Sequence, residues 1–372
     1  MAIQNRYEFI YYVACSNCNP NGDPDMGNMP RIDPQTMQGF ITDGATKRRI
    51  RNYVELAYRD KPGMDIIIQQ ATNINRIIAE VREAAGTPVA TKTKNDEAKK
   101  PEYIHKARAE ACRRFYDVRT FGAVLSTGPN AGQVRGPVQI TFGKSLDTVL
   151  PLDISITRVS TADDVGNNQA QSVNAYTEME KSAAADVLRT MGRKQIIPFG
   201  LYEVRGFVSA NLAEETGFDE EDLNVLFESI LNMYEHDHSA SKGEMAVVSP
   251  LIIFKHIGTD SDAAQRVRQA KLGCAPAHKL FDLVKVTKKA AVEYPRSYRD
   301  YDAAVKLDKV PSGVQIGFKP DPFSPIVWDD LPDGEDWFCR GCLGADPPFT
   351  AVARWFLPAA GRAGVCAPYS GA

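Results

Sequence analysis

Residues 6–14 (RYEFIYYVA) and the stretch that directly follows them, residues 15–25 (CSNCNPNGDPD), decide the fold of this chain. The first stretch is aromatic and β-branched, which favours a strand in the core. The second is a dense cluster of turn formers, so we expect the strand to give way to a loop from Cys15 onward. This loop should continue past the Asp-Pro pair at residues 33–34 before a helix can begin.

A basic helix is expected directly after this loop. Thr42 or Asp43 can cap it, and residues 44–58 (GATKRRIRNYVELAY) place apolar side chains at helical spacing. Its first two turns carry four cations, which are Lys47, Arg48, Arg49 and Arg51. Cations near a helix N-terminus oppose the helix dipole, so this placement costs stability unless an anion binds there. A phosphate would accept hydrogen bonds from the helix N–H groups and from the guanidinium groups.

The remaining pattern predicts an α+β fold. The other expected elements are helices over residues 74–84, 103–116 and 223–234 and strands over residues 136–142, 196–210, 247–255 and 280–286. Residues 158–192 are polar with few apolar anchors, which is typical of an extended insertion that projects from the core. This order of elements is expected of an α+β sandwich of the split βαβ type, expanded by insertions.

The composition is that of a globular protein in a reducing compartment. The chain has 372 residues, of which 43% are hydrophobic and 24% charged, and these values exclude wholesale disorder. No apolar run reaches the roughly 18 residues of a membrane span, and the N-terminus lacks a signal-peptide pattern. Seven cysteines are too few for a disulfide scaffold of this size. We therefore expect a cytoplasmic protein with no membrane partner.

The net charge of −3 hides an asymmetry along the chain. From Asp321 onward there are seven acidic and three basic residues, which leaves 40 acidic and 41 basic residues in residues 1–320. The body of the protein is therefore neutral, and the clustering of its bases decides whether it can bind a polyanion. The tail after residue 320 is rich in Gly and Pro, and the sequence assigns it no role.

Three motifs suggest catalysis or metal binding, and each also has a structural explanation. Two histidines, His236 and His238, follow a predicted helix, where a histidine also interacts favourably with the helix dipole. Cys15-x-x-Cys18 and Cys339-x-x-Cys342 together have the spacing of a four-thiolate zinc site, although the first pair is expected in a loop. The third motif consists of three loop acids, which are Asp23, Asp25 and Asp33. They could bind a catalytic metal, but Asp in such a loop is more often turn chemistry.

Basic residues at the helix start and at loop ends form the more coherent set. The expected phosphate contacts are Lys47, Arg48, Arg51, Arg119, Arg135, Arg158, Arg193 and Lys194. Several such clusters, without a catalytic constellation, favour a protein that tracks a nucleic-acid backbone.

Longer strings in the sequence resemble a known family. They include NPNGDPD at 19–25, KRRIRN at 47–52, RTFGAV at 119–124, GQVRGPVQ at 132–139, SITR at 155–158, TMGRK at 190–194, PFGLY at 198–202, NMYEHD at 232–237 and APAHKLFDLVKV at 275–286. Together they resemble the backbone subunit of type I-C CRISPR interference (Cascade) complexes, which is the Cas7 family of the RAMP superfamily. The resemblance runs in order from about Arg6 to Val286.

The resemblance implies an RNA-recognition-motif (ferredoxin-like) palm with a helical finger insertion and an extended thumb hairpin. The implied boundaries are residues 1–60, 119–157 and 196–290 for the palm, 61–118 for the fingers, 158–195 for the thumb and 291–372 for a C-terminal extension. Met191, at the end of the thumb, would be an apolar wedge against a displaced base.

The resemblance also implies a non-catalytic subunit that polymerises head to tail along a CRISPR guide RNA and presents its bases to target DNA. Further copies of itself, a RAMP-type cap subunit, a large subunit and a small subunit would be its partners, and no cofactor or metal is expected. The alternative is an endoribonuclease that processes the CRISPR precursor RNA, which would need a base such as His236 or His278 near a Tyr or Lys. A third hypothesis makes the acidic loop a metal-dependent nuclease that requires Asp33.

Overall fold

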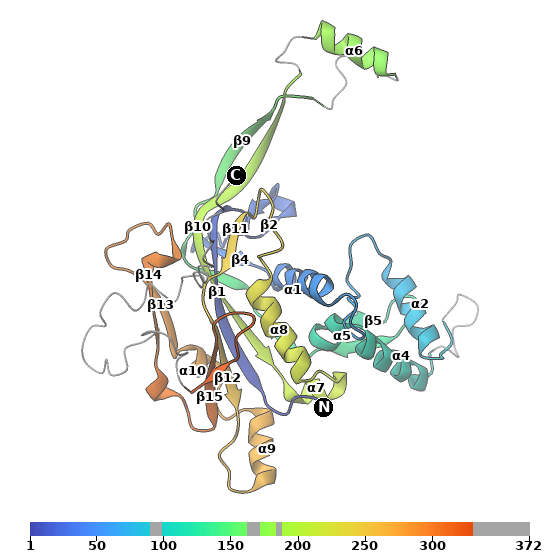
Figure 1. Ribbon diagram of the computed structural model, residues 1–372, viewed down its shortest axis with the longest axis vertical. Coiled ribbons are helices and arrows are strands. Elements are labelled where there is room, and N and C mark those ends of the chain that lie inside the picture. Colours follow the sequence, from blue (N-terminus) through green and yellow to red (C-terminus); the bar gives the residue numbers. More distant parts are fainter. Residues whose placement is uncertain (90–98, 162–171, 184–187, 330–372) are drawn as a thin grey trace, which may run out of the picture.

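The fold was analysed in a computed structural model of the chain, which describes residues 1–89, 99–161, 172–183 and 188–329 (Figure 1). The second half of the expected zinc site, Cys339 and Cys342, lies outside the described residues, as does the tail from residue 330. None of the described helices is long and apolar enough to cross a membrane.

An antiparallel sheet forms the centre of the molecule. Its central strand, β1 (Tyr7–Cys18), pairs with β10 (Thr190–Val208) on one side and with β11 (Glu244–Val247) and β12 (Leu251–His256) on the other. The sheet continues outward from β12 through β15 (Val314–Lys319) to β16 (Val327–Trp328), and from β10 through β8 (Gly143–Thr148) to β4 (Gln38–Ile41), while β7 (Val138–Ile140) also pairs with β10. The first strand predicted from the sequence is thus the middle of the sheet.

Strand β1 is buried on both faces, which explains its unbroken apolar run. On one face Phe9 and Tyr11 pack in a core with α1 (Asp43–Tyr58) and α8 (Glu220–Asn232). On the other face Ile10 and Tyr12 pack in a second core. This second core includes side chains of α10 (Ala277–Phe281), β13 (Val284–Lys288) and β14 (Tyr301–Val305).

The chain connects its central elements in the order β1, α1, β8, β10, α8, β12, and the corresponding strands lie side by side in the order β12-β1-β10-β8. Both helices cover the same face of the sheet. This is the connectivity of a split βαβ unit, and the order of elements in the sequence predicted it.

A side lobe, formed by residues 64–89 and 99–135, packs beside α1 around a core of its own (Figure 1). Its elements are α2 (Ile74–Ala84), α4 (Pro101–Arg114), α5 (Tyr116–Phe121), β5 (Gly122–Leu125) and β6 (Gly132–Arg135). The sequence predicted one helix over residues 103–116. The structure has two, because the backbone of Phe115 is extended and this residue is buried in the lobe core.

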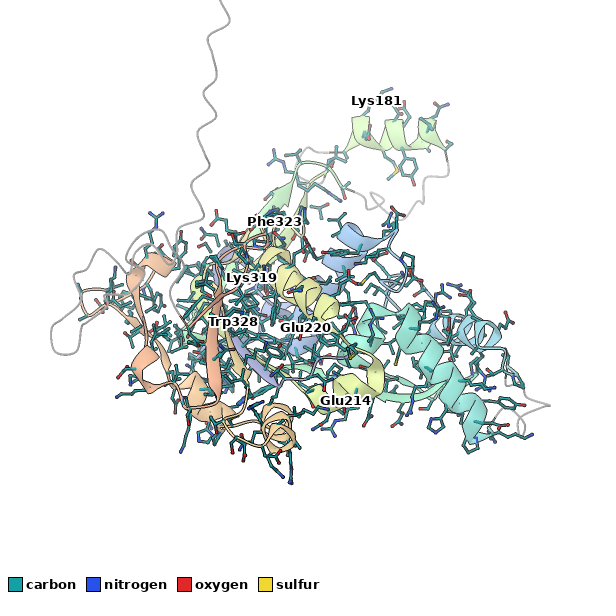
Figure 2. The ribbon with its side chains drawn as sticks, turned by 60° about the horizontal axis from the view of Figure 1, so that its bottom comes forward. Lys181, Glu214, Glu220, Lys319, Phe323 and Trp328 are labelled. Atoms are coloured by element: carbon teal, nitrogen blue, oxygen red, sulfur yellow. The ribbon has the colours of Figure 1, made fainter. Side chains whose placement is uncertain are left out.

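A long hairpin projects from the sheet (Figure 1). It consists of β9 (Leu152–Arg158) and the first part of β10, which pair from Leu152 opposite Ile196 to Arg158 opposite Thr190. Helix α6 (Val173–Ser182) lies at its outer end, and Figure 2 shows Lys181 of α6 far from Glu220 at the start of α8. The hairpin starts at Leu152 rather than at residue 158, because Leu152 already pairs with Ile196 of β10.

Two further expectations about local structure were wrong. Leu280 and Phe281, expected in a strand, end helix α10, whose apolar side chains pack into the second core, and the strand begins only at Val284. Cys15 and Cys18, expected in a loop, both lie in β1, because this strand stays paired with β10 as far as Cys18. The remaining described elements are β2 (Gly22–Asp23), β3 (Met29–Pro30), α7 (Ala210–Thr216), α9 (Ala263–Leu272) and three 3-10 turns (Pro24–Met26, Tyr298–Asp300 and Leu307–Lys309).

The close contact between β1 and β10 predicts the effect of one substitution. A Cβ atom at Gly206 of β10 would overlap the ring of Phe9. Gly206→Ala should therefore lower the free energy of unfolding by about 1–3 kcal/mol, as overpacking typically does, in urea denaturation. In Gly44→Ala the new methyl group meets open space within α1, and this control should raise the free energy of unfolding by about 0.4–1 kcal/mol. Equal changes in the free energy of unfolding for the two variants would contradict the close contact between Gly206 and the ring of Phe9.

Candidate nucleic-acid interface

The loop after β1 fixes the start of the basic helix α1. The Thr42 hydroxyl accepts a hydrogen bond from the N–H of Ala45 and donates one to Oδ1 of Asn21 in this loop, at 2.9 Å. Thr42 is therefore the N-cap, which decides between the two caps that the sequence allowed. Asn21 also accepts from the N–H of Thr42, so the Asn-Pro-Asn-Gly turn and the helix start are held as one unit.

Three basic side chains gather at this end of the sheet, and we define Arg48, Arg49 and Lys242 as the cation cluster. Arg49 is only 3% exposed and stacks on the ring of Tyr234. Its Nη1 donates to the carbonyl of Ala45, and its Nε lies 3.2 Å from Oδ2 of Asp237 without hydrogen-bond geometry. Its Nη2 has no hydrogen-bond partner among the residues that the structure describes. A buried guanidinium so poorly compensated is costly, and a bound anion would relieve that cost.

The other two members of the cluster reinforce its positive potential. Burial, and then the nearby positive charges of Arg49 and Arg48, hold the pKa of Lys242 below its usual value, although Asp237 acts in the opposite direction. Arg48 is exposed and forms no ion pair with any described residue. Lys194 lies close by, because its Nζ donates to the carbonyl of Ala240 in the loop that carries Lys242. The cluster is therefore a local excess of positive charge.

Lys47 and Arg51 point from α1 toward the side lobe. The Nζ of Lys47 lies 3.0 Å from Asp43, and the Nε of Arg51 lies 2.7 Å from the fully buried Asp117. Both cations also lie over the ring of Phe121, so they join the helix to the lobe and are only partly available to a ligand.

Arg135 lies in the same region of the surface. It stands opposite Gly122, the residue after Phe121, in the β5–β6 hairpin. It is exposed and has no ion pair among the described residues. It is thus available to a ligand at the edge of the side lobe.

Arg119 has a structural role, which corrects its expected place among the phosphate contacts. Its guanidinium binds both carboxylate oxygens of Asp222 at 2.7 and 2.8 Å and also donates to the carbonyl of Cys112. The residue is 8% exposed. Its donors are directed at groups of α8 and the side lobe, so they cannot reach a phosphate.

The projecting hairpin presents its four predicted residues on two faces. Arg193 is exposed, 3.5 Å from Asp153, and shares a face with Met191, whose side chain is 77% exposed. Arg158 and Lys194 lie on the opposite face, where Arg158 donates to the carbonyl of Ser160 and to the hydroxyl of Thr190.

The sequence analysis missed an apolar stripe on the hairpin. Leu152, Ile154 and Ile156 alternate with polar residues along β9, so they share the face of Lys194, and each is about two-fifths exposed. The strict alternation over residues 152–157 (LDISIT) was the signal that could have revealed them. Arg49 was counted among the helix cations but not among the expected contacts, and nothing in the local sequence marked Lys242.

Of the predicted histidines, His236 lies beside a tyrosine whose hydroxyl is already bound to a carboxylate. His236 lies beside Tyr53, with 6.1 Å between their ring centres, in an open pocket at the end of α1. The Tyr53 hydroxyl donates to Glu228, and burial together with this carboxylate raises the pKa of Tyr53 to about 12. Tyr53 is therefore a weak acid catalyst near neutral pH. His238, in the loop after α8, and His278, on α10, are both exposed.

The loop acids act as turn formers. Asp23 accepts a hydrogen bond from the N–H of Asp25, and Asp33 accepts from the N–H groups of Gln35 and Thr36, which lowers the pKa of Asp33. Among the residues that the structure describes, no group of three or more His, Cys, Asp or Glu side chains is placed to hold a metal ion.

Comparisons with known proteins agree on one family. Residues 5–307 match the family model described as CRISPR-associated protein Cas7. A CRISPR-associated protein Cas7 of Haloferax volcanii is 26% identical over 245 residues, which cover 61% of this chain and 63% of that protein. This chain thus spans less than two thirds of the length of this curated relative.

Among solved structures, chains of two CRISPR complexes are similar to this chain, both with TM-scores below 0.5. A chain of a CRISPR RNA-guided surveillance complex in a pre-nicking state has a TM-score of 0.40 and 13% identity, over 74% of this chain and 86% of that chain. A chain of another CRISPR RNA-guided surveillance complex has a TM-score of 0.38 and 12% identity, over 74% and 80% respectively.

The different roles of Arg119 and Arg48 can be separated by stability measurements. Arg119→Ala leaves the buried carboxylate of Asp222 unpaired and should lower the free energy of unfolding by about 3–5 kcal/mol in urea denaturation. The matched control is Arg48→Ala, which removes an exposed side chain and should change this free energy by no more than about 0.5 kcal/mol. A small effect of Arg119→Ala would return Arg119 to the candidate ligand contacts.

Proposed function

The chain belongs to the Cas7 family of CRISPR-associated proteins, and on this premise we propose that it is a non-catalytic, CRISPR RNA-binding backbone subunit of a type I-C interference complex. In this role it polymerises along the guide RNA and presents the RNA bases for pairing with target DNA.

The cation cluster is the observation that carries this proposal. Among the described residues, the buried Arg49 has a nitrogen without a hydrogen-bond partner and Arg48 forms no ion pair. Burial, and then the positive neighbours Arg49 and Arg48, lower the pKa of Lys242. A phosphate of the RNA backbone supplies the missing negative charge and accepts the free hydrogen bonds. Contacts of this kind hold the backbone and leave the base edges free for pairing.

In this proposal the parts of the fold have distinct tasks. The sheet with α1 and α8 is an RNA-recognition-motif-like palm, the side lobe is the fingers, and the projecting hairpin is the thumb. Connectivity of the split βαβ type supports the palm assignment. Arg158, Arg193 and Lys194 of the thumb, together with Lys47, Arg51 and Arg135 beside the fingers, continue the phosphate contacts outward from the cluster.

The thumb is proposed to reach over the next copy in a head-to-tail filament. Met191 is highly exposed, as an apolar wedge against a displaced base must be. The exposed stripe of Leu152, Ile154 and Ile156 offers apolar area for the neighbouring copy. A RAMP-type cap subunit, a large subunit, a small subunit and target DNA complete the proposed set of partners, in the cytoplasm.

The endoribonuclease hypothesis is not favoured by the geometry at His236, because the Tyr53 hydroxyl is already bound to Glu228. Incubating the pure protein with repeat RNA distinguishes the two functions. Intact RNA agrees with a structural subunit. Site-specific cleavage that disappears in His236→Ala or His278→Ala would replace the proposal with the nuclease function.

Salt-dependent binding to single-stranded RNA tests the cation cluster. Each of Arg48→Ala, Arg49→Ala and Lys242→Ala should make the negative slope of log K against log [salt] shallower by about 0.7, because each removes one charge that displaces a counterion from a single strand. The loss should be similar for RNAs of different sequence. Arg268→Ala is the matched control, because this exposed arginine lies on α9, at the end of the molecule opposite the thumb (Figure 1). Binding that does not depend on salt, or that strongly prefers one base, would refute the proposal.

The apolar stripe of the thumb can be tested by assembly. The double variant Ile154→Ser, Ile156→Ser removes apolar side chains that a neighbouring copy would bury, so cooperative loading on RNAs of increasing length should weaken by about tenfold or more. Affinity for an RNA that holds one copy should stay the same. The control is Ser155→Ala, Thr157→Ala on the other face of the same strand, measured by native mass spectrometry. If the control variant weakens cooperative loading as strongly as the double serine variant, the apolar stripe is not the contact between neighbouring copies.

A further inference from the structure

Cys15 and Cys18 are unusual neighbours. In a regular strand, residues three apart point to opposite faces and lie about 10 Å apart. Here both thiols lie in the same core beneath α1 and α8, with their Sγ atoms only 3.0 Å apart. The cause is Asn17, whose left-handed backbone (φ 45°) turns the end of the strand. The local fold thus brings two thiols into contact at a position where strand geometry alone would separate them.

The geometry of the pair suits a disulfide better than half of a zinc site. Two thiolates on a tetrahedral zinc ion, each about 2.3 Å from the metal, lie about 3.8 Å apart. The observed separation is shorter, and a shift of about 1 Å would bring the two sulfurs to the S–S bond length of about 2.05 Å.

The pair is also connected to the cation cluster. Cys15 pairs with Met245 in β11, and the N–H of Asn19, next to Cys18, donates to the carbonyl of Ser241 at 2.7 Å. Ser241 directly precedes Lys242. Burial raises the pKa of the Cys15 thiol, and the nearby Arg49 and Lys242 act in the opposite direction. A movement of Cys18 would therefore reach the loop that positions Lys242.

We propose that Cys15 and Cys18 form a reversible dithiol–disulfide pair, and that formation of the disulfide displaces the loop that carries Lys242 of the cation cluster. The first part stands on the geometry alone, and the second rests on the proposed function.

The oxidant is a low-molecular-weight disulfide such as oxidised glutathione. The thiolate of one cysteine attacks a sulfur of the small disulfide and releases one small thiol. The thiolate of the other cysteine then attacks the protein sulfur of the mixed disulfide and releases the second small thiol. The two protein protons pass to the two released thiols, and the two electrons lost by the protein reduce the small disulfide. Because both thiols are fully buried, the exchange takes place when the strand end opens.

The thiol chemistry is tested on the full chain in glutathione redox buffers, approached from both the reduced and the oxidised protein. Free thiols are then alkylated in denaturant and the tryptic peptide of residues 7–31 is weighed, since it contains Cys15 and Cys18 as its only cysteines. In oxidising buffer we expect a peptide without alkyl groups and two hydrogens lighter than the dithiol, and dithiothreitol should restore the dithiol. Cys112 is the internal control, because it is also buried but lies in another core, and it should stay free.

If Cys15 and Cys18 remain a dithiol in the most oxidising buffer, whether the protein starts reduced or oxidised, the proposed disulfide is refuted. Zinc that is retained by the native protein and lost in Cys15→Ala, Cys18→Ala would also overturn it.

The link to the cation cluster is tested by RNA binding. The oxidised protein should bind single-stranded RNA about threefold or more weakly than the reduced protein, because one phosphate-neutralising lysine is displaced. The double variant Cys15→Ala, Cys18→Ala should not respond to the redox buffer. Equal RNA affinity in both redox states would overturn the link and leave the disulfide standing. If neither state binds RNA, the proposed function fails, whereas the mass measurement still decides the thiol chemistry.

Discussion

Burial of β1 on both faces is the constraint on which the rest of the structure depends. Its side chains alternate between two cores, so α1 and α8 must cover one face while α10 and the β13–β14 hairpin cover the other. Strand β10 pairs with nearly the whole length of β1. The remaining part of β10 extends beyond β1 and forms one side of the projecting hairpin. The packing of one central strand thus sets where the hairpin leaves the body.

The same strand brings the candidate site together. Its last residues and the loop that follows hold both the start of α1, through Asn21, and the loop before β11, through Asn19. Arg49 and Lys242 come from these two segments, nearly two hundred residues apart in the chain, and meet with too little negative charge between them. Such a cluster costs folding free energy, and the polyanionic ligand proposed above would offset that cost on binding. The arrangement therefore favours binding over stability of the free protein.

Charge in the sequence was an unreliable guide to exposure. Arg48 and Arg119 look alike in the sequence, since each stands in a basic or turn-rich segment, yet one is exposed and the other is enclosed by Asp222 and backbone carbonyls. Lys47 and Arg51 are intermediate, because acidic partners and the ring of Phe121 occupy part of their reach. Whether a cation has a partner depends on residues remote in the chain, and no local pattern contains that information.

The sequence by itself determined the elements whose apolar pattern is strong: the core strand β1, the capped helix α1, helix α2 with its bounds, and helix α8, together with the split βαβ order. A local pattern is enough for these, because helical spacing places apolar side chains on one buried face and an unbroken apolar run fits a strand that is buried on both faces. Only the tertiary structure decided that α10 replaces part of an expected strand, that Arg119 belongs to the core, and that Lys242 completes the cation cluster. It also decided that two cysteines expected in a loop meet inside a strand. These depend on contacts between distant segments, whose energies become defined only when the chain has folded.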